Sequence, residues 1–423
     1  MSRVKVMLWG LEIGAVIWDA ENDVAAFQYS DKFCELGIEL SPLHMPVIKK
    51  RIYRFKDLNI DTFWALPGLI SQSLPDKFGN DIINKYISTL GKNSDNFTPV
   101  DRLQYIGNRG MGAIEFLPDQ STQANGDVDL DELISFCRNI ITRKNEDLVE
   151  YLNKANNYES FVHITTSAGG AKAKALLAFN PDTEIFEAGD ADVNRGFQDW
   201  LIKFDHSEPE QEYLPTTRVE YAYYLQALAS GIQMSESRLL SKDGCYHFMT
   251  KRFDRIDGQK VLMQSLCNLF HLDFSKIHPY EQAMALAQKH LGMGIDQISE
   301  IFRIAVFNVV YRNEDDHSNN ISFIMGKDGK WSLAPAYDLT YGHVPSGGFH
   351  QSQHQMSVNG KTQDITLDDL MACALSSGIK KKPAENIIHD VISSRSLWSD
   401  SASASGLSAS CSKMLAYEIL RKI

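Results

Sequence analysis

Residues 313–320 read NEDDHSNN, a run of eight polar residues between two apolar segments. Loops that follow packed elements often carry catalytic or binding residues, because the scaffold holds them still. Asp315 lies five residues before Asn320, which is the spacing of the catalytic Asp and the metal-binding Asn in a protein-kinase loop. Such a loop can accept a proton through Asp315 and hold a cation through Asn320. A solvated loop in which Asp and Asn only cap turns is the alternative.

A β-hairpin is predicted directly after this octet. The segments ISFIM and WSLAPAYD flank GKDGK, and Asp-Gly between two apolar runs is a strong hairpin signal. Antiparallel pairing would return Asp338 to the neighbourhood of Asp315 and Asn320. Because Mg²⁺ prefers carboxylate and carbonyl oxygens together with substrate phosphates, Asn320 and Asp338 are predicted to be its ligands. A metal-dependent hydrolase built on Asp315, Asp316, His317 and Asp338 is a competing hypothesis.

Two features upstream of the octet suit a phosphate group. The segment SAGGAKAK (167–174) places Gly169 and Gly170 before a predicted strand, and small residues let backbone N–H groups approach a phosphate. Lys203 lies on a second predicted strand, LIKFD, between apolar neighbours. Its side chain can point into a cleft, as the strand lysine of kinases does, or into solvent from an edge strand. The hydrolase hypothesis leaves both features without a role.

The elements that must position these residues alternate between strands and helices. Residues 1–120 begin with a predicted three-stranded meander, and their glycine-rich GNRGMG stretch lacks the spacing of a nucleotide-binding motif, so we interpret it as a structural turn. Residues 121–254 contain the phosphate loop and the ATP lysine. Residues 255–423 are chiefly helical and contain the octet. These three ranges are the predicted domains: an N-terminal mixed α/β subdomain, an N-lobe core and a mainly helical C-lobe.

The order of the chemical features is that of a protein kinase. A glycine loop comes first, then a strand lysine, then a helical lobe with Asp-x₄-Asn, and finally a metal-binding Asp. The predicted fold class is therefore α+β, with a two-lobed, protein-kinase-like arrangement of a mixed α/β N-terminal lobe and a mainly α-helical C-terminal lobe. The predicted strand YHFMTKRFDR (246–255) falls where the lobes would join and where adenine would meet backbone groups.

Composition limits the remaining classes. The chain has 423 residues, so two or three domains are expected. A net charge of −12 is not that of a protein that binds nucleic acid over a wide surface. Six cysteines without CxxC spacing indicate free thiols in a reducing compartment. No run approaches the roughly 18 apolar residues of a membrane span, and Glu12 interrupts the apolar N-terminal stretch, so we expect a cytoplasmic protein.

His350 and His354 lack an HExxH context, and a loop is expected there instead of a zinc helix. The Ser/Ala-rich segment 399–412 is expected to be a loop or a weak helix.

The sequence resembles the HipA family of serine/threonine kinase toxins from type II toxin–antitoxin systems. The resemblance covers nearly the whole chain and rests on FQYSDKF, SLPDKFGN, GMGAIEFLP, TSAGGAKAKALL, VEYAYYLQALASGI, KRFDR, DDHSNNISFI, LAPAYDL and HQMSVNGK. It implies a HipA-like fold and an ATP- and Mg²⁺-dependent kinase that inhibits growth by phosphorylating a cellular protein. Some members of the family modify aminoacyl-tRNA synthetases, but nothing in this sequence selects a target.

The resemblance also implies roles for individual residues. Asp315 corresponds to the catalytic base, and Asn320 and Asp338 correspond to the Mg²⁺ ligands. Residues of the phosphate loop, the strand lysine, the hinge and the octet would bind the nucleotide: Gly169, Gly170, Lys174, Lys203, Lys251, Phe253, His317, Asn320 and Tyr337. Ser167 corresponds to a serine whose autophosphorylation ejects the loop and silences the kinase, with Thr165 and Thr166 as alternative sites.

The resemblance implies one further partner besides the protein substrate, a helix-turn-helix antitoxin of the HipB type. The chain would contact operator DNA only through this antitoxin, and no membrane contact is expected. The alternative function is a catalytically inactive kinase-fold module that binds nucleotide and antitoxin but transfers no phosphate.

Overall fold

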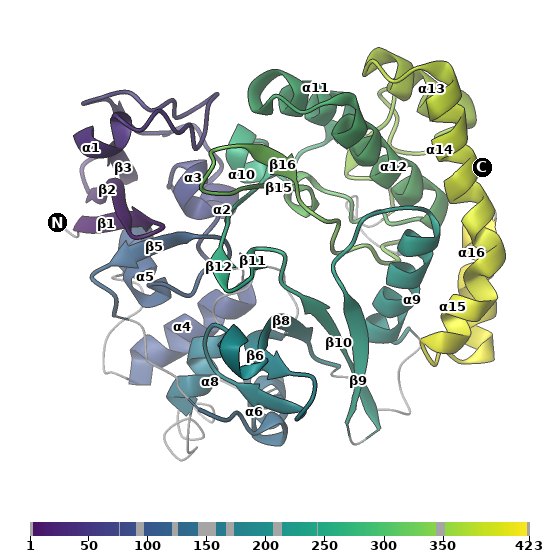
Figure 1. Ribbon diagram of the computed structural model, residues 1–423, viewed down its shortest axis with the longest axis horizontal. Helices are drawn as coiled ribbons and strands as arrows, with labels where there is room; N and C mark the ends of the chain where they lie inside the picture. Colours follow the sequence, from purple (N-terminus) through teal and green to yellow (C-terminus); the bar gives the residue numbers. More distant parts are fainter. Residues whose placement is uncertain are drawn as a thin grey trace. The chain divides into compact units, whose positions relative to one another are not determined.

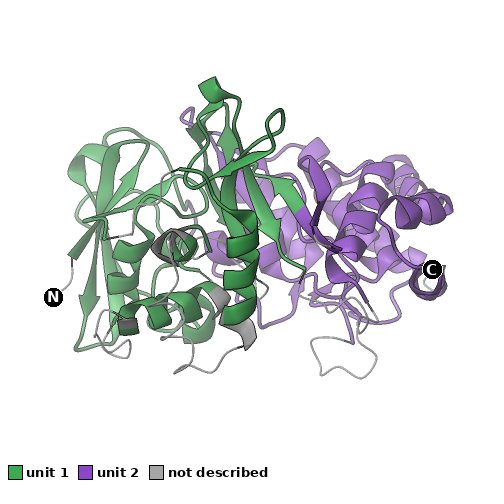
Figure 2. Ribbon diagram, turned by 90° about the horizontal axis from the view of Figure 1, so that it is seen from below, with its two compact units in different colours: residues 1–41, 45–206, 249–264 green, residues 42–44, 207–248, 265–423 purple. Residues whose placement is uncertain are grey.

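In the computed structural model, the described residues are 3–75, 77–89, 97–120, 126–142, 158–165, 173–205, 214–242, 244–343 and 352–420. The chain divides into two units (Figure 2). Unit 1 comprises Met1–Ser41, Met45–His206 and Met249–Gln264, and unit 2 comprises Pro42–His44, Ser207–Phe248 and Ser265–Ile423. The predicted domain boundaries at 120 and 254 do not coincide with these changes of unit, and the three-domain division stays a prediction.

Unit 1 begins with an antiparallel sheet in the strand order β4-β3-β2-β1-β5 (Figure 1). Its strands are β1 (Arg3–Leu8), β2 (Leu11–Asp19), β3 (Val24–Tyr29), β4 (Ile52–Tyr53) and β5 (Ile114–Leu117). In β1 the buried Val4, Val6 and Leu8 alternate with more exposed residues, as the period of two in a strand requires. The predicted three-stranded meander is confirmed.

Unit 1 also contains five helices in the described part of residues 1–120. They are α1 (Asp31–Cys34), α2 (Ile60–Phe63), α3 (Gly68–Ser71), α4 (Lys77–Thr89) and α5 (Pro99–Ile106). Helix α5 begins with a capping box, in which the Thr98 side chain and the Asp101 side chain each bind the other's backbone N–H. Pro99 occupies the first turn, where its missing N–H removes no helical hydrogen bond. Helix α5 packs against β1 and β5.

A second group of strands in unit 1 carries the predicted phosphate-binding lysines. β6 (Lys174–Asn180) pairs antiparallel with β7 (Ile185–Glu187) and β8 (Gln198–Lys203). Every residue of β6 is buried, and helix α8 (Tyr158–Thr165) packs on this strand. The remaining elements of this unit are α6 (Leu130–Thr142), the 3₁₀ helix η2 (Val193–Arg195), β11 (Arg255–Ile256) and β12 (Gln259–Lys260). The strands predicted after SAGGAKAK and at LIKFD are confirmed.

A buried ion network in unit 1 explains the glycine-rich GNRGMG stretch. Arg252 Nη2 and Arg255 Nη1 lie 2.8 and 3.0 Å from Asp254 Oδ2, which also accepts the Gly112 N–H at 2.6 Å. Burial alone would raise the pKa of Asp254, but the two guanidinium groups outweigh it and hold the pKa below its usual range. Gly112 has a φ of +81°, and a Cβ there would lie 3.0 Å from the Met263 backbone nitrogen. The stretch is a structural turn, as predicted.

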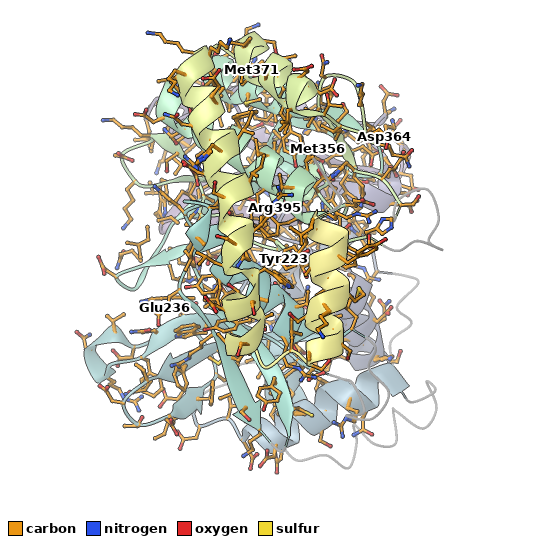
Figure 3. All side chains as sticks on the ribbon, turned by 90° about the vertical axis from the view of Figure 1, so that its right-hand side faces the viewer. Tyr223, Glu236, Met356, Asp364, Met371 and Arg395 are labelled. Atoms are coloured by element: carbon orange, nitrogen blue, oxygen red, sulfur yellow. The ribbon has the colours of Figure 1, made fainter. Side chains whose placement is uncertain are left out.

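Unit 2 is built mainly from helices (Figure 1). They are α9 (Thr216–Ala229), α10 (Leu266–Phe270), α11 (Tyr280–Leu291), α12 (Ile295–Tyr311), α13 (Leu367–Ser376), α14 (Lys381–Ser394), the 3₁₀ helix η4 (Arg395–Leu397), α15 (Trp398–Ala404) and α16 (Ala409–Leu420). Helix α12 is buried throughout 304–311 and packs against α11 and α14. Tyr223 of α9, labelled in Figure 3, donates its hydroxyl to the Tyr311 carbonyl at 2.6 Å. The end of α12, where the octet starts, is thereby held in the core.

Short strands complete unit 2. They are β9 (Ser237–Lys242), β14 (His278–Pro279), β15 (Ser322–Met325), β16 (Trp331–Leu333) and β17 (Met356–Ser357), with the 3₁₀ turn η3 (Ser318–Asn320). Two further strands, β10 (Cys245–Lys251) and β13 (Leu262–Ser265), carry the chain between the units. β15 pairs antiparallel with β16, with Phe323 opposite Leu333 and Met325 opposite Trp331. The predicted hairpin is confirmed.

The Ser/Ala-rich tail is helical. Segment 399–412 forms most of α15 and the start of α16, so of the two predicted alternatives, loop or weak helix, the helix holds for most of it. The reason is tertiary, because Trp398, Ala402, Cys411 and Leu415 are buried in the core of unit 2. Small residues between these apolar anchors favour helix once one face is covered.

The cysteines and the hydropathy pattern complete the description. All six cysteines are free, with Cys137, Cys267, Cys373 and Cys411 buried. Among the helices in the described ranges, none is long and apolar enough to cross a membrane.

Candidate active site

The octet leaves the buried end of α12 through a pair of asparagines. The Asn313 backbone N–H and side-chain Nδ2 donate to the carbonyl and the Oδ1 atom of Asn308, both at 2.9 Å. From there the side chains alternate: Glu314 is buried, Asp315 is exposed and Asp316 is buried. The exposed Asp315 therefore lies between two buried acids.

Asp316 anchors a distant segment of the chain. Its Oδ1 atom accepts the backbone N–H groups of Gln355 at 2.7 Å and Met356 at 3.4 Å. Its Oδ2 atom accepts the Tyr280 hydroxyl at 3.0 Å and lies 3.0 Å from His354 Nδ1. Because both oxygens of this buried carboxylate are engaged within the protein, Asp316 is a structural residue. The hydrolase hypothesis loses one of its four metal-binding candidates.

Asp315 has the environment expected of a base. Its side chain is 60% exposed, and its Oδ1 atom accepts the Gln355 Nε2–H at 2.8 Å. His317 Nε2 lies 3.8 Å from the same oxygen, which is too far for a hydrogen bond. The carboxylate is accessible to an acceptor hydroxyl and is oriented by one amide.

The backbone beneath Asp315 is covered by Gly342. The Gly342 N–H donates to the Arg312 carbonyl at 3.1 Å. A Cβ on Gly342 would lie 2.7 Å from the Asp315 nitrogen and 2.8 Å from the Glu314 nitrogen. Real Cβ atoms do not approach so closely, so the segment that follows Asp338 can pass over the octet here only as glycine.

Tyr337 connects the hairpin to the octet. Its hydroxyl donates to the Asn319 carbonyl at 2.6 Å and lies 2.6 Å from the Ser322 hydroxyl. Burial raises the pKa of Tyr337 above its usual range, so it remains a donor. These bonds hold Tyr337, which precedes Asp338, against Asn319, which precedes Asn320.

The two predicted metal ligands are themselves constrained. Asn320 ends the 3₁₀ turn η3, and its Nδ2 atom donates to the Asp315 carbonyl at 2.9 Å. Asp338 is half-buried and has a φ of +53°, a left-handed conformation that is uncommon outside glycine. Strained backbone of this kind persists where the surroundings enforce it and gathers at functional sites. The segments that bear Asn320 and Asp338 are joined by the Tyr337–Asn319 hydrogen bond.

Two buried polar atoms beside this pair fit a polar ligand. Within the described ranges, His317 Nδ1 and Asn319 Oδ1 are among the buried polar atoms that have no hydrogen-bond partner in the protein. Such atoms destabilise a fold unless something pairs with them. The described residues also contain no group of three or more His, Cys, Asp or Glu side chains that could hold a metal ion. Phosphate oxygens in addition to Asn320 and Asp338 would complete a site of the kind usual for Mg²⁺.

Unit 1 contains the remaining predicted residues. Lys203, at the end of β8, is half-buried and lies opposite the buried Lys174 in β6. Cross-strand neighbours share a face of the sheet, so both ammonium groups are on one face. Lys251 ends β10, and Lys251 and Phe253 are half-buried. These positions are compatible with the predicted phosphate and adenine contacts, which stay predictions.

The phosphate loop lies mostly outside the described residues. Ser167, Gly169, Gly170 and Thr166 all fall in 166–172, which the structure does not describe. Thr165 is fully buried, and its hydroxyl donates to the Phe161 carbonyl at 2.6 Å. A hydroxyl held in this way is a poor phosphorylation site.

Two family models match the sequence. The HipA N-terminal domain matches residues 4–117, and the HipA-like C-terminal domain matches residues 166–398, which is more than half of the chain. The chain belongs to the HipA family. The HipA-like fold predicted from the sequence is confirmed.

A solved HipA structure has the same fold. The chain is similar to HipA of the Shewanella oneidensis MR-1 toxin–antitoxin system, in a complex with HipB and its operator DNA, with a TM-score of 0.68 and 18% identity over 99% of this chain and 97% of that one. At this identity the likeness shows the fold alone. A weaker match, to the proinflammatory kinase CtkA of Helicobacter pylori, has a TM-score of 0.32 and 11% identity over 53% of this chain and 91% of that one, and supports no conclusion. A comparison with curated protein sequences gave no match.

Sequence analysis of this HipA-family chain missed several residues of the site. Gln355 and His354 lie in HQMSVNGK, which was noted only for the resemblance, and His354 was considered only for zinc. Glu314 was also missed. Its carboxylate lies 2.7 Å from His343 Nδ1 and 3.3 Å from Arg312 Nε, and so ties the end of segment 338–343 to the octet. An acid directly after Arg312-Asn313 was the only local signal for this contact.

Proposed function

We propose that this HipA-family chain is an ATP- and Mg²⁺-dependent serine/threonine protein kinase that acts as the toxin of a HipBA-like module. The observation that carries the proposal is the Tyr337–Asn319 hydrogen bond. It joins the hairpin that bears Asp338 to the loop that bears Asp315 and Asn320. A proton acceptor and two cation ligands on one frame are what phosphoryl transfer requires.

The residues of unit 2 have separate roles in this proposal. Asp315 accepts the proton of a serine or threonine hydroxyl while the hydroxyl oxygen bonds to the γ-phosphorus and ADP leaves. Asn320 and Asp338 hold Mg²⁺, which when bound neutralises charge on the phosphates. His317 and Tyr337 line the nucleotide site, with Tyr337 acting through its hydrogen bonds.

The proposed roles in unit 1 rest on the family resemblance and on the sheet register. Lys203 and Lys174 are cross-strand neighbours, so their side chains lie on one face of the sheet. From that face the two lysines would contact the ATP phosphates. Gly169 and Gly170 would supply backbone N–H groups to the phosphates, and Lys251 and Phe253 would border the adenine.

Phosphate transfer tests the proposal directly. Purified chain is incubated with [γ-³²P]ATP and Mg²⁺, alone and with a host-cell lysate, and labelled proteins are identified by mass spectrometry. We expect labelling of the chain itself and of a lysate protein, and slower labelling of both, by about 10²–10⁴-fold, in Asp315→Ala. A chain that binds ATP but labels nothing would instead be the catalytically inactive nucleotide- and antitoxin-binding module.

Autophosphorylation at Ser167 is the proposed silencing step. A phosphate adds about −1.5 to −2 charge, which would repel the ATP phosphates from the glycine loop. Ser167→Asp should therefore weaken ATP binding, whereas Ser167→Ala should bind ATP normally and stay active. Peptide mapping separates Ser167 from Thr166, and the buried hydroxyl of Thr165 makes that residue the least suitable of the three. Equal ATP affinity of the two Ser167 variants would reject this step.

The proposed partner is a small helix-turn-helix antitoxin of the HipB type. The net charge of −12 suits a basic DNA-binding partner, because complementary charge speeds association at low salt. Co-purification from the native host should yield one small basic protein, and the isolated chain should not shift operator DNA at physiological salt. Tight, sequence-specific DNA binding by the chain alone would contradict this.

A further inference from the structure

Gln355 contacts the carboxylate that is proposed to be the catalytic base. Its Nε2 atom lies 2.8 Å from Asp315 Oδ1. Among the described residues, Gln355 is the side chain that donates to this carboxylate, while His317 Nε2 is 3.8 Å away. The contact spans 40 positions of sequence. A surface loop with no neighbour at this point would leave the Asp315 side chain free to change rotamer.

The backbone that presents Gln355 is held by the acid next to Asp315. The Gln355 N–H donates to Asp316 Oδ1 at 2.7 Å, and His354 Nδ1 lies 3.0 Å from Asp316 Oδ2. Asp316 and His354 are both buried. Asp316 therefore fixes the backbone at Gln355, and the side chain of Gln355 orients Asp315.

Neighbouring contacts make this segment part of the helical core. Met356, labelled in Figure 3, is buried and lies opposite His278 in the parallel β17–β14 pair. The Asn359 N–H donates to Glu281 Oε1 in α11 at 2.7 Å. Gln355 thus lies directly before a short strand with fixed neighbours, and a segment anchored in this way places a side chain more accurately than a free loop does.

We infer that Gln355 is a positioning residue for the proposed kinase reaction, which orients the Asp315 carboxylate so that one oxygen binds the amide and the other faces the acceptor hydroxyl. This inference rests on the proposed function. Without the amide, the Asp315 side chain redistributes over its roughly three χ1 wells. A misplacement of about 1 Å at a reacting group lowers a rate about 10²-fold. We therefore expect a loss between about threefold and a hundredfold.

The kinetic test uses substitutions at residue 355. Gln355→Ala should lower the rate constant of self-phosphorylation at saturating Mg·ATP within that range. Gln355→Asn, which is one methylene shorter and cannot reach Asp315, should do the same. Gln355→Glu should lose more, because it places two carboxylates together. The Mg·ATP concentration at half-maximal rate and the melting temperature should be unchanged in all three. Gln353→Ala is the matched control, since Gln353 bonds Thr362 and not Asp315.

A double-mutant cycle separates positioning from general structural support. In an Asp315→Ala background, Gln355→Ala should cause almost no further loss, because the residue acts through Asp315. A full additional loss in that background would overturn the inference. So would a wild-type rate in Gln355→Ala.

A wild-type chain that transfers no phosphate would reject the proposed function only. In that case a spectroscopic measurement still tests the contact between Gln355 and Asp315. The ¹⁵N–¹H signals of the Gln355 side-chain amide are assigned as the pair lost in Gln355→Glu. They should move in Asp315→Ala and stay in place in Gln353→Ala. Signals that are indifferent to Asp315→Ala would show that the contact does not exist in solution.

Discussion

Replacing Asp316 by alanine tests whether the neighbouring acids of the octet divide structure and chemistry between them. Asp316 is buried and accepts the Tyr280 hydroxyl, His354 Nδ1 and two backbone N–H groups. Asp315, one position earlier, is 60% exposed. Asp316→Ala should lower the free energy of unfolding of unit 2, whereas Asp315→Ala should leave it almost unchanged.

The size of the effect follows from the contacts. Removing one partner of a buried, hydrogen-bonded charge costs about 3–5 kcal/mol. For a unit of this size, each kcal/mol lowers Tm by about 2–4 °C, which gives a fall of roughly 6–20 °C. Asp316→Asn keeps an oxygen acceptor for the backbone N–H groups and should lose only about 1–2 kcal/mol. Asp315→Ala should stay within about 0.5 kcal/mol of wild type, as surface substitutions usually do.

Thermal unfolding followed by circular dichroism measures all three variants under one condition. The expected order of Tm is wild type and Asp315→Ala together, then Asp316→Asn, then Asp316→Ala. If Asp316→Ala melted with the wild type, the carboxylate would not hold segment 354–356. The argument for a fixed Gln355 would then also fail.

Four further outcomes are expected. Asp315→Ala should lower phosphate transfer by about 10²–10⁴-fold, the usual value of a general base, while calorimetry still shows Mg·ATP binding; a wild-type rate would remove Asp315 from the mechanism. Asp338→Ala should abolish the Mg²⁺ dependence of ATP binding in the same calorimeter, and an unchanged dependence would mean that the metal is elsewhere. Gly342→Ala should displace the octet and lower transfer about 10²-fold, whereas Gly294→Ala, with nothing within 4 Å of the new Cβ, should be silent. Burial and then the charge of His44 lower the pKa of His271 from 6.5 to about 3. The protonated form therefore disfavours folding, so stability should fall as pH drops from about 6.5 towards 3, and the urea midpoint of His271→Asn should be less sensitive to acid over this range.

The sequence by itself determined the features that depend on local pattern. The period of two in β1 and the apolar run of α12 predict a strand and a helix, because burial of one face or of a whole helix leaves its mark within a few residues. Asp-Gly predicts the β15–β16 hairpin for the same local reason. The octet could be recognised as a candidate site, since the Asp315-to-Asn320 spacing lies within one loop. The family resemblance rested on such short segments.

Tertiary structure decided what each residue of the site does. Nothing local in Glu314-Asp315-Asp316 indicates which acid faces solvent; Tyr280 and segment 354–356 decide it by enclosing Asp316. The closeness of Gly342 to the octet likewise appears only when the chain returns. The helical state of 399–412 depends on where Trp398 and Leu415 are buried. Contacts between residues tens of positions apart depend on how the whole chain packs, and a local pattern carries no record of that packing.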